Sequence, residues 1–210
     1  MQKLKELKMK ENLLPKLGFG TASIALGSQM EAERTLKFAL ENGIRYFDTA
    51  PLYGGGQAEV RLGQALKDAP KNIMVSTKCG RYRDYGTAGP ASSGLDDTWD
   101  YSEKTIRESI NLSQDRLNRE FLDIVYLHDI ETSPKEAFEV GLPLLREMQT
   151  KGVVGAIGAG CNTVEGLLSA IEAGASDILL VAGRWTLLDR SAGRELLYKA
   201  ELNGVHIVVG

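Results

Sequence analysis

The sequence predicts an α/β protein of the (β/α)8 TIM-barrel type. Short β-branched or aliphatic runs alternate with segments of helical periodicity, which is the pattern of repeated strand and helix units. The runs begin mostly 24 to 32 residues apart and carry few polar residues before their ends, as buried parallel strands do. Polar side chains gather at the carboxyl ends of these runs, which is where a barrel places its active site.

Seven strands and six helices are expected. The strands cover residues 17–21, 45–49, 73–78, 122–128, 153–160, 177–181 and 205–209. The helices cover residues 31–42, 59–66, 103–117, 134–150, 163–173 and 193–203. Four helices end at a glycine just before the next strand, namely Gly43, Gly152, Gly174 and Gly204. The regular recurrence of these helix-ending glycines predicts one continuous domain over residues 1–210.

An open, doubly wound sheet is the alternative architecture. Its dinucleotide-binding form would carry G-x-G-x-x-G after the first strand, but no third glycine follows Gly18 and Gly20 at the required position. The barrel is therefore preferred. Such a barrel typically takes about 250 residues, so we expect that the last β/α unit is missing and that a hairpin at residues 4–14 closes the bottom. Open barrel edges would then favour self-association.

The composition excludes several classes of function. The chain is 43% hydrophobic and 25% charged, which is ordinary for a globular protein. Its net charge of −3 and the lack of a long basic block argue against nucleic acid. The longest apolar stretch, 178–182, is too short to span a membrane. Cys79 and Cys161 have no zinc or disulfide spacing, so a cytoplasmic protein without a metal is expected.

Four different ionisable side chains lie at or just after successive strand ends: Asp48, Tyr53, Lys78 and His128. This combination suits proton donation to a carbonyl oxygen that gains negative charge as hydride arrives at carbon. A cation beside a phenol favours the phenolate, and Lys78 can be that cation for Tyr53. Asp48 would keep Lys78 charged, while His128 would orient the substrate oxygen by a hydrogen bond.

With these motifs the chain resembles the aldo-keto reductase family. The resemblance rests on Gly18-Phe-Gly-Thr21, Phe47-Asp48-Thr-Ala-Pro-Leu-Tyr53-Gly, Glu59-Val-Arg-Leu-Gly63, Ser76-Thr-Lys78, Leu127-His128 and Ile157-Gly-Ala-Gly-Cys-Asn162. It implies that the catalytic tetrad of the family falls on Asp48, Tyr53, Lys78 and His128, with Tyr53 as general acid or base. It also implies hydride transfer with NADP or NAD as cofactor.

The resemblance places cofactor contacts less completely. It implies that Gly20, Thr21, Asp48, Cys161, Asn162 and Trp185 bind the cofactor. Asn162 matches the asparagine that binds the nicotinamide carboxamide, and Trp185 matches the aromatic residue that stacks on the nicotinamide ring. Cys161 stands where the family commonly has serine, and we expect it to face the cofactor cavity. Ala182 stands where the family usually has a glutamine.

The substrate expected is a small carbonyl compound or sugar. Leu52-Tyr53-Gly-Gly-Gly-Gln-Ala-Glu59, Lys78-Cys-Gly-Arg-Tyr82 and His128-Asp-Ile-Glu131 resemble the branch of the family that oxidises free sugars at C1, a branch also similar to pyridoxal dehydrogenases. Two other hypotheses stay open. One is a non-catalytic barrel fragment or binding module, and the other is a lyase that forms a Schiff base through Lys78.

Overall fold

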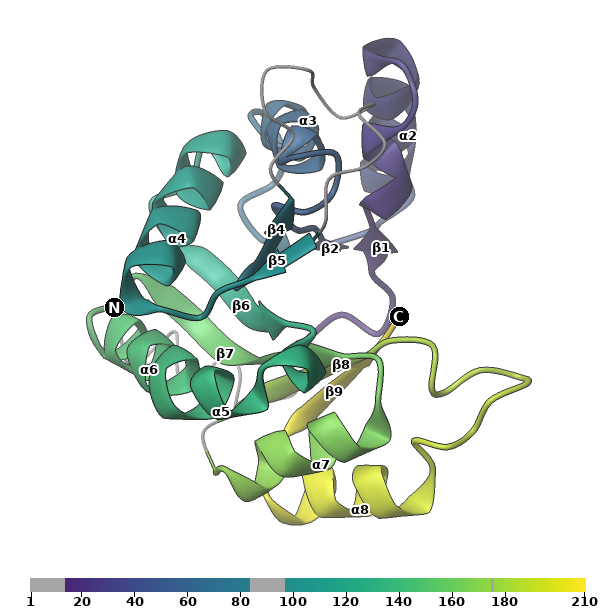
Figure 1. Cartoon of the computed structure of the whole chain (residues 1–210). Helices are drawn as coiled ribbons and strands as arrows, with labels where there is room; N and C mark the ends of the chain where they lie inside the picture. Colours follow the sequence, from purple (N-terminus) through teal and green to yellow (C-terminus); the bar gives the residue numbers. More distant parts are fainter. Residues whose placement is uncertain (1–13, 84–96, 175) are drawn as a thin grey trace.

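A parallel sheet forms the centre of the molecule (Figure 1). The computed structural model describes residues 14–83, 97–174 and 176–210. Within them the sheet has the order β1-β2-β3-β6-β7-β8-β9, and every neighbouring pair is parallel. Its strands are β1 (Phe19–Gly20), β2 (Tyr46–Asp48), β3 (Met74–Cys79), β6 (Leu122–His128), β7 (Val154–Cys161), β8 (Ile178–Val181) and β9 (His206–Val209). The expected parallel barrel strands are therefore confirmed as a partial (β/α)8 barrel.

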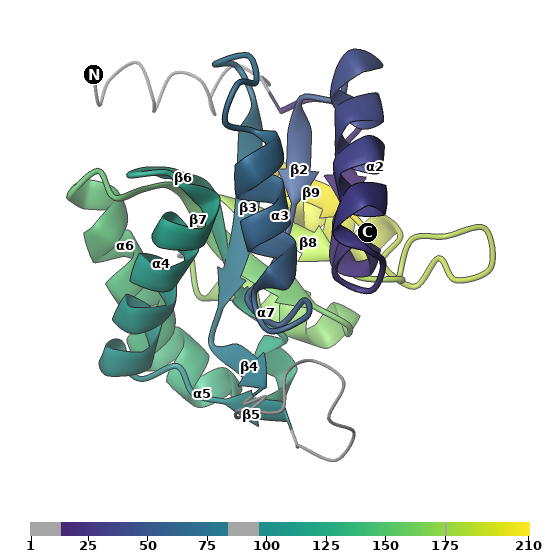
Figure 2. The same cartoon turned by 90° about the horizontal axis from the view of Figure 1, so that it is seen from above.

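Helices cover the outer face of this curved sheet (Figures 1 and 2). The α-helices are α2 (Gln29–Glu41), α3 (Gln57–Ala65), α4 (Glu103–Leu117), α5 (Pro134–Glu136), α6 (Leu142–Thr150), α7 (Val164–Glu172) and α8 (Arg194–Leu202). Side-chain caps explain where some of them begin. Ser28 and Glu31 form a reciprocal capping box at the start of α2, and Ser102 accepts a backbone hydrogen bond at the start of α4. Asn118 ends α4 in the left-handed conformation.

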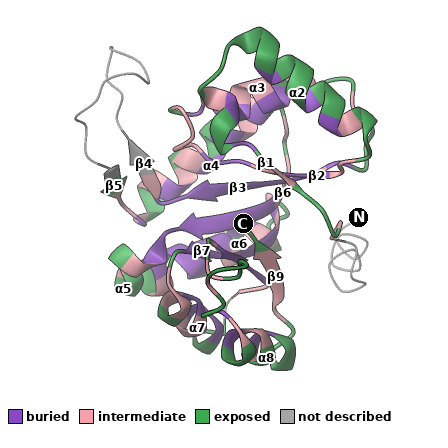
Figure 3. Ribbon diagram, turned by 90° about the vertical axis from the view of Figure 1, so that its right-hand side faces the viewer, coloured by how far each residue is buried: buried purple, intermediate pink, exposed green. Residues whose placement is uncertain are grey.

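Strands β3 and β7 are mostly buried, whereas the covering helices are partly exposed (Figure 3). Alternation along the strands separates two buried faces. The inner face holds Tyr46, Ile124, Tyr126, Ala156, Ile178 and Leu180. The outer face packs against the helices and includes Phe47, Val75, Val125, Leu127, Ile157, Ala159, Leu179 and Val181. In β2, β3 and β6 the last inner-face positions are polar, so the apolar interior gives way to a polar rim at the carboxyl ends of these strands.

Several local features differ from the sequence-based expectations. The helix expected over 134–150 is interrupted, because the π-helical turn η3 (Ala137–Gly141) separates α5 from α6. An antiparallel pair, β4 (Arg81–Arg83) and β5 (Asp97–Trp99), was not expected. The hairpin expected at 4–14 lies outside the described residues except for its last residue, Leu14. Among the helices that are described, none is both long and apolar enough to cross a membrane.

Helices α3 and α4 approach each other closely at Gly63. A Cβ atom at this position would lie 2.3 Å from the carbonyl oxygen of Arg116 and 2.9 Å from the Cα of Leu117. Both contacts are to backbone atoms, so a rotamer change cannot relieve them. Hydrogen therefore fits at this position and a methyl group does not.

The substitution Gly63→Ala should lower the free energy of unfolding by about 1–2 kcal/mol, because overpacking against backbone atoms, which costs about 2–3 kcal/mol, outweighs the gain in helix propensity of about 1 kcal/mol. Urea titration followed by circular dichroism measures this difference. Gly20→Ala is the matched control, since no heavy atom lies within 4 Å of a Cβ there. Equal stability of the two variants would contradict the close helix contact.

Candidate active site

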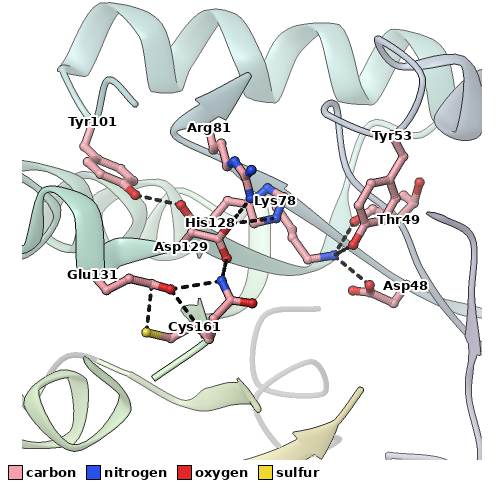
Figure 4. Close-up of polar contacts among 11 residues, drawn as sticks. Asp48, Thr49, Tyr53, Lys78, Arg81, Tyr101, His128, Asp129, Glu131 and Cys161 are labelled. Atoms are coloured by element: carbon pink, nitrogen blue, oxygen red, sulfur yellow. Dashed lines mark hydrogen bonds and ion pairs between the residues drawn. The ribbon is translucent and has the colours of Figure 1, made fainter. Parts of the chain in front are cut away.

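The four residues expected to form the tetrad lie together at the carboxyl ends of neighbouring strands (Figure 4). Asp48 ends β2, Lys78 lies near the end of β3, and His128 ends β6. Tyr53 follows β2 in the turn before α3. Parallel pairing places these strand ends at the same edge of the sheet, so residues far apart in the chain become neighbours.

The Lys78 ammonium connects three partners. Its Nζ donates hydrogen bonds to Asp48 Oδ2 at 2.6 Å, to the Thr49 carbonyl oxygen at 2.8 Å and to Tyr53 Oη at 3.1 Å. These bonds match the three donors of an ammonium group. Burial acts to lower the pKa of Lys78, but the charges and hydrogen bonds of Asp48 and Tyr53 together outweigh it, and the pKa is raised. Lys78 is therefore a charged donor and not a free amine nucleophile.

Asp48 is held from its other side by a chain of hydroxyl groups. Ser76 Oγ donates to Asp48 Oδ1 at 2.6 Å, and Tyr46 Oη lies 2.8 Å from Ser76 Oγ. Tyr126 Oη lies 3.5 Å from Tyr46 Oη on the inner face. Burial and the nearby Asp48 charge raise the pKa of Tyr46 to about 12, so this phenol remains protonated and can donate. Both oxygens of the Asp48 carboxylate are thus engaged.

A glycine turn and an ion pair with a buried carboxylate position Tyr53. Gly54 and Gly56 have φ values of 60° and 86°, a region that glycine adopts readily. A Cβ on Gly56 would meet the Arg116 guanidinium at 2.4 Å, so this loop lies directly against α4. Arg116 Nη1 in turn donates to the buried Glu59 carboxylate at 3.1 Å. The turn that carries Tyr53 is therefore fixed between α3 and α4.

His128 is a buried, neutral imidazole. Burial, with the charges of Lys78 and Arg81, lowers the pKa of His128 well below its usual value. Its ring meets the Tyr53 ring edge to face with centroids 6.3 Å apart. Its Nε2 lies 3.8 Å from Asp129 Oδ2, and its buried Nδ1 has no hydrogen-bond partner among the described residues. A neutral imidazole orients a substrate by hydrogen bonding and is a poor proton source near neutral pH.

A second polar cluster lies beyond His128, and sequence reasoning assigned no role to most of it. Asn162 Nδ2 donates to Asp129 Oδ1 at 2.8 Å and to Glu131 Oε1 at 2.9 Å. Arg81, from the unexpected strand β4, pairs with Asp129, and its guanidinium lies 4.9 Å from the Trp99 ring centroid. Only Asn162 was expected at a binding site.

The remaining residues expected to bind cofactor lie in different settings. Gly20 is exposed at the end of β1, and the buried Thr21 donates its hydroxyl to the Asp48 carbonyl oxygen at 3.0 Å. Trp185 is 37% exposed in the segment between β8 and α8, with the Arg190 guanidinium 6.0 Å from its ring centroid.

The expectation that Cys161 faces the cofactor cavity is wrong. Cys161 belongs to the outer-face cluster with Ile157 and Ala159, and its Sγ lies 2.9 Å from Glu131 Oε2. Odd-numbered positions of β7 point toward the helices, so Cys161 shares their direction. Burial, followed by the hydrogen bond with Glu131, raises the pKa of this thiol to about 11. Cys79, which follows Lys78 in β3, is also buried on the outer face.

The fold and this cluster define a class: parallel partial barrels with an Asp, Tyr, Lys and His constellation at the carboxyl rim. The chain belongs to the aldo/keto reductase family, whose model matches residues 16–210. It is 38% identical to a D-threo-aldose 1-dehydrogenase of a Pseudomonas species, over 93% of this chain and 64% of that protein. It is 32% identical to a pyridoxal 4-dehydrogenase of Microbacterium luteolum, over 92% of this chain and 65% of that protein.

A solved structure shows the same architecture. The aldo-keto reductase of Bacillus halodurans in its holo form superposes with a TM-score of 0.77 at 27% identity, over 92% of this chain and 61% of that chain. The chain thus spans less than two thirds of the length of these relatives. The resemblance inferred from the motifs is confirmed at the level of family and fold.

The lowered pKa of His128 predicts a pH dependence of stability. An unfolded histidine has a pKa of about 6.5. Below this pH, His128 therefore binds a proton in the unfolded chain but not in the folded chain. The free energy of unfolding should therefore fall as pH drops from about 6.5 to 5, by at most ~1.4 kcal/mol per pH unit.

Urea titrations across this range, on the wild type and on His128→Asn, measure the effect. The variant should lose most of the slope, and His206→Asn, which removes the other histidine of the chain, should keep it. The range stops at pH 5 because the raised pKa of Asp129 acts in the opposite direction in more acidic solution. The same slope in wild type and His128→Asn would show that the imidazole is not held neutral.

Proposed function

We propose that this chain carries the active site of an NAD(P)-dependent oxidoreductase that uses Tyr53 as general acid and base. The reaction interconverts an aldehyde or ketone with its alcohol, or a sugar hemiacetal with its lactone. The observation that carries the proposal is the 3.1 Å hydrogen bond between Lys78 Nζ and Tyr53 Oη, within a cluster that also holds Asp48. A phenol next to a fixed ammonium can release its proton and leave a stabilised phenolate.

The residues at the rim fit a nicotinamide cofactor. Asn162 offers an amide carbonyl oxygen with no partner among the described residues, which suits a carboxamide N–H donor. Trp185 offers a partly exposed ring for stacking. When bound, the nicotinamide supplies hydride for reduction or accepts it in oxidation. The proposal covers NAD and NADP, because these two residues would contact the nicotinamide end that both cofactors share.

The residues of the chain handle the proton. In reduction, Tyr53 donates its hydroxyl proton to the substrate oxygen, and Lys78 stabilises the phenolate that remains. In oxidation, the same phenolate accepts the proton from the substrate hydroxyl. His128 holds that oxygen by a hydrogen bond without changing its own charge, because its pKa is lowered well below the usual value. Tyr53 is then the proton donor and Lys78 the electrostatic stabiliser.

The names of the relatives support a substrate class. One relative is a D-threo-aldose 1-dehydrogenase and another is a pyridoxal 4-dehydrogenase, so both act on small oxygenated molecules. We propose a free aldose, oxidised at its anomeric carbon, as the substrate. The hydroxyl group on the anomeric carbon would lose its proton to Tyr53, and the C–H bond of the same carbon would give up hydride to the nicotinamide. The product is a lactone.

The geometry of Lys78 favours this function over the lyase hypothesis. A Schiff-base lysine needs a neutral amine with room for a carbonyl carbon. Lys78 is 1% exposed, its pKa is raised, and each of its three donors already has an acceptor. The intact tetrad likewise supports catalysis over a role as a binding module.

The substitution Tyr53→Phe should reduce turnover at least ~10²-fold, because it removes the proton donor and keeps the ring. The rate of aldose oxidation is measured from the increase in absorbance of the reduced nicotinamide. Cofactor affinity should change less than about 2-fold, since only one hydroxyl is lost at the substrate side. Tyr198→Phe, an exposed position on α8, is the control and should keep full activity. An active Tyr53→Phe enzyme would refute the assignment.

The stacking role of Trp185 predicts a fluorescence signal. Titration with NADP or NAD should quench tryptophan emission, and Trp185→Ala should remove most of this quench. The chain has two tryptophans, so Trp99→Phe is the internal control and should retain the signal. An unchanged quench in Trp185→Ala would place the nicotinamide away from this loop.

A further inference from the structure

The side-chain amide of Asn162 is held by two carboxylates. Its Nδ2 donates to Asp129 Oδ1 at 2.8 Å and to Glu131 Oε1 at 2.9 Å, and its backbone N–H donates to the same Glu131 oxygen at 3.0 Å. The backbone carbonyl of Asn162 accepts from Arg184 Nε at 2.6 Å. The turn after β6 thus holds both the side chain and the backbone N–H, and Arg184 from the segment after β8 holds the backbone carbonyl. Figure 4 shows the two carboxylates, Asp129 and Glu131, side by side at this edge.

The donor and acceptor roles of its partners determine the orientation of the Asn162 side-chain amide. An ionised carboxylate only accepts hydrogen bonds, so both contacts need the NH2 end of the amide. A flipped amide would place its carbonyl oxygen against two negatively charged groups. In this orientation both N–H groups of Asn162 Nδ2 form hydrogen bonds. Asn162 Oδ1 is left as an acceptor without a partner among the described residues.

The two carboxylates are themselves fixed. Asp129 has a left-handed backbone conformation with a φ of 54° directly after β6, and Arg81 supplies its counter-charge. Glu131 lies in the next turn, with one oxygen 2.9 Å from Cys161 Sγ and the other on Asn162. Cys161 therefore belongs to this arrangement through Glu131, although its side chain faces the helices.

We propose that Asp129 and Glu131 are positioning residues that fix the Asn162 amide with its carbonyl oxygen toward the cofactor. The site then selects a dinucleotide that carries an N–H donor on its pyridine ring, which is the carboxamide of nicotinamide. This inference rests on the proposed function and adds to it a selectivity for dinucleotides with a carboxamide N–H donor. The selecting element is the amide orientation, imposed by charge from two residues that do not themselves touch the cofactor.

An analogue that lacks the donor tests the proposal. In the 3-acetylpyridine analogue of NADP or NAD a methyl ketone replaces the carboxamide, so the N–H donor is lost while the size is nearly kept. The wild-type chain should bind the nicotinamide form ~5-fold more tightly, the effect of one hydrogen bond. In the double variant Asp129→Asn, Glu131→Gln the amide is free to flip, and the ratio should fall below about 2-fold.

The controls separate structure from selectivity. Glu139→Gln removes a carboxylate from the same part of the chain without touching Asn162, and it should keep the wild-type ratio. Thermal unfolding checks that each variant is folded, and the single variant Glu131→Gln replaces the double variant if the latter is unstable. A double variant that keeps the full ratio overturns the positioning role.

A second readout needs no cofactor. The Asn162 side-chain NH2 group, observed by NMR, should exchange with solvent at least ~10-fold faster in the double variant, because two hydrogen bonds to carboxylates are lost. Equal exchange in both proteins also overturns the inference. If the wild-type chain binds neither dinucleotide but the exchange rates differ as expected, the proposed function fails while the orientation of the amide stands.

Discussion

The buried ion pair between Lys78 and Asp48 is the constraint on which the arrangement of the site depends. An ammonium group at 1% exposure is stable only when charge and hydrogen bonds replace its water. Asp48, the Thr49 carbonyl and Tyr53 supply that replacement from β2 and the turn after it, while Lys78 comes from β3. A shift of either strand by one residue would turn one charge to the helix side and leave the other buried alone.

The same strand is fixed from its opposite face. Thr77, next to Lys78, donates its hydroxyl to the fully buried Glu59 at 2.6 Å, and Arg116 balances the Glu59 charge from α4. Glu59 lies in α3, directly after the turn of Tyr53. The half-buried Asp48 carboxylate on the inner side and the buried Glu59 carboxylate on the outer side therefore hold β3. The distance between Lys78 and Tyr53 is set by this pair of contacts together with the glycine turn.

The sequence predicted the part of the site that strand order alone determines. Asp48, Lys78 and His128 each stand at or near the end of a recognisable strand, so parallel pairing was sufficient to bring them together. Cys161 was misplaced, although the alternation of inner and outer positions along β7 places it on the outer face. Arg81, Asp129 and Ser76 could not be assigned, because their contacts depend on an unexpected strand, a left-handed residue and a neighbouring carboxylate. Nor does any local pattern reveal the π-helical turn within 134–150.

His128 divides the rim into two parts with different tasks. On one side Lys78 and Asp48 form a charged pair around Tyr53, and on the other Arg81 faces Asp129. Burial disfavours a protonated imidazole, and the two cations Lys78 and Arg81 repel it as well, which is why the pKa of His128 is lowered. In the proposed reaction, a neutral His128 leaves the transfer of the proton to Tyr53. On the other side, Asp129 and Glu131 hold the Asn162 amide, and the proposed proton transfer does not involve them.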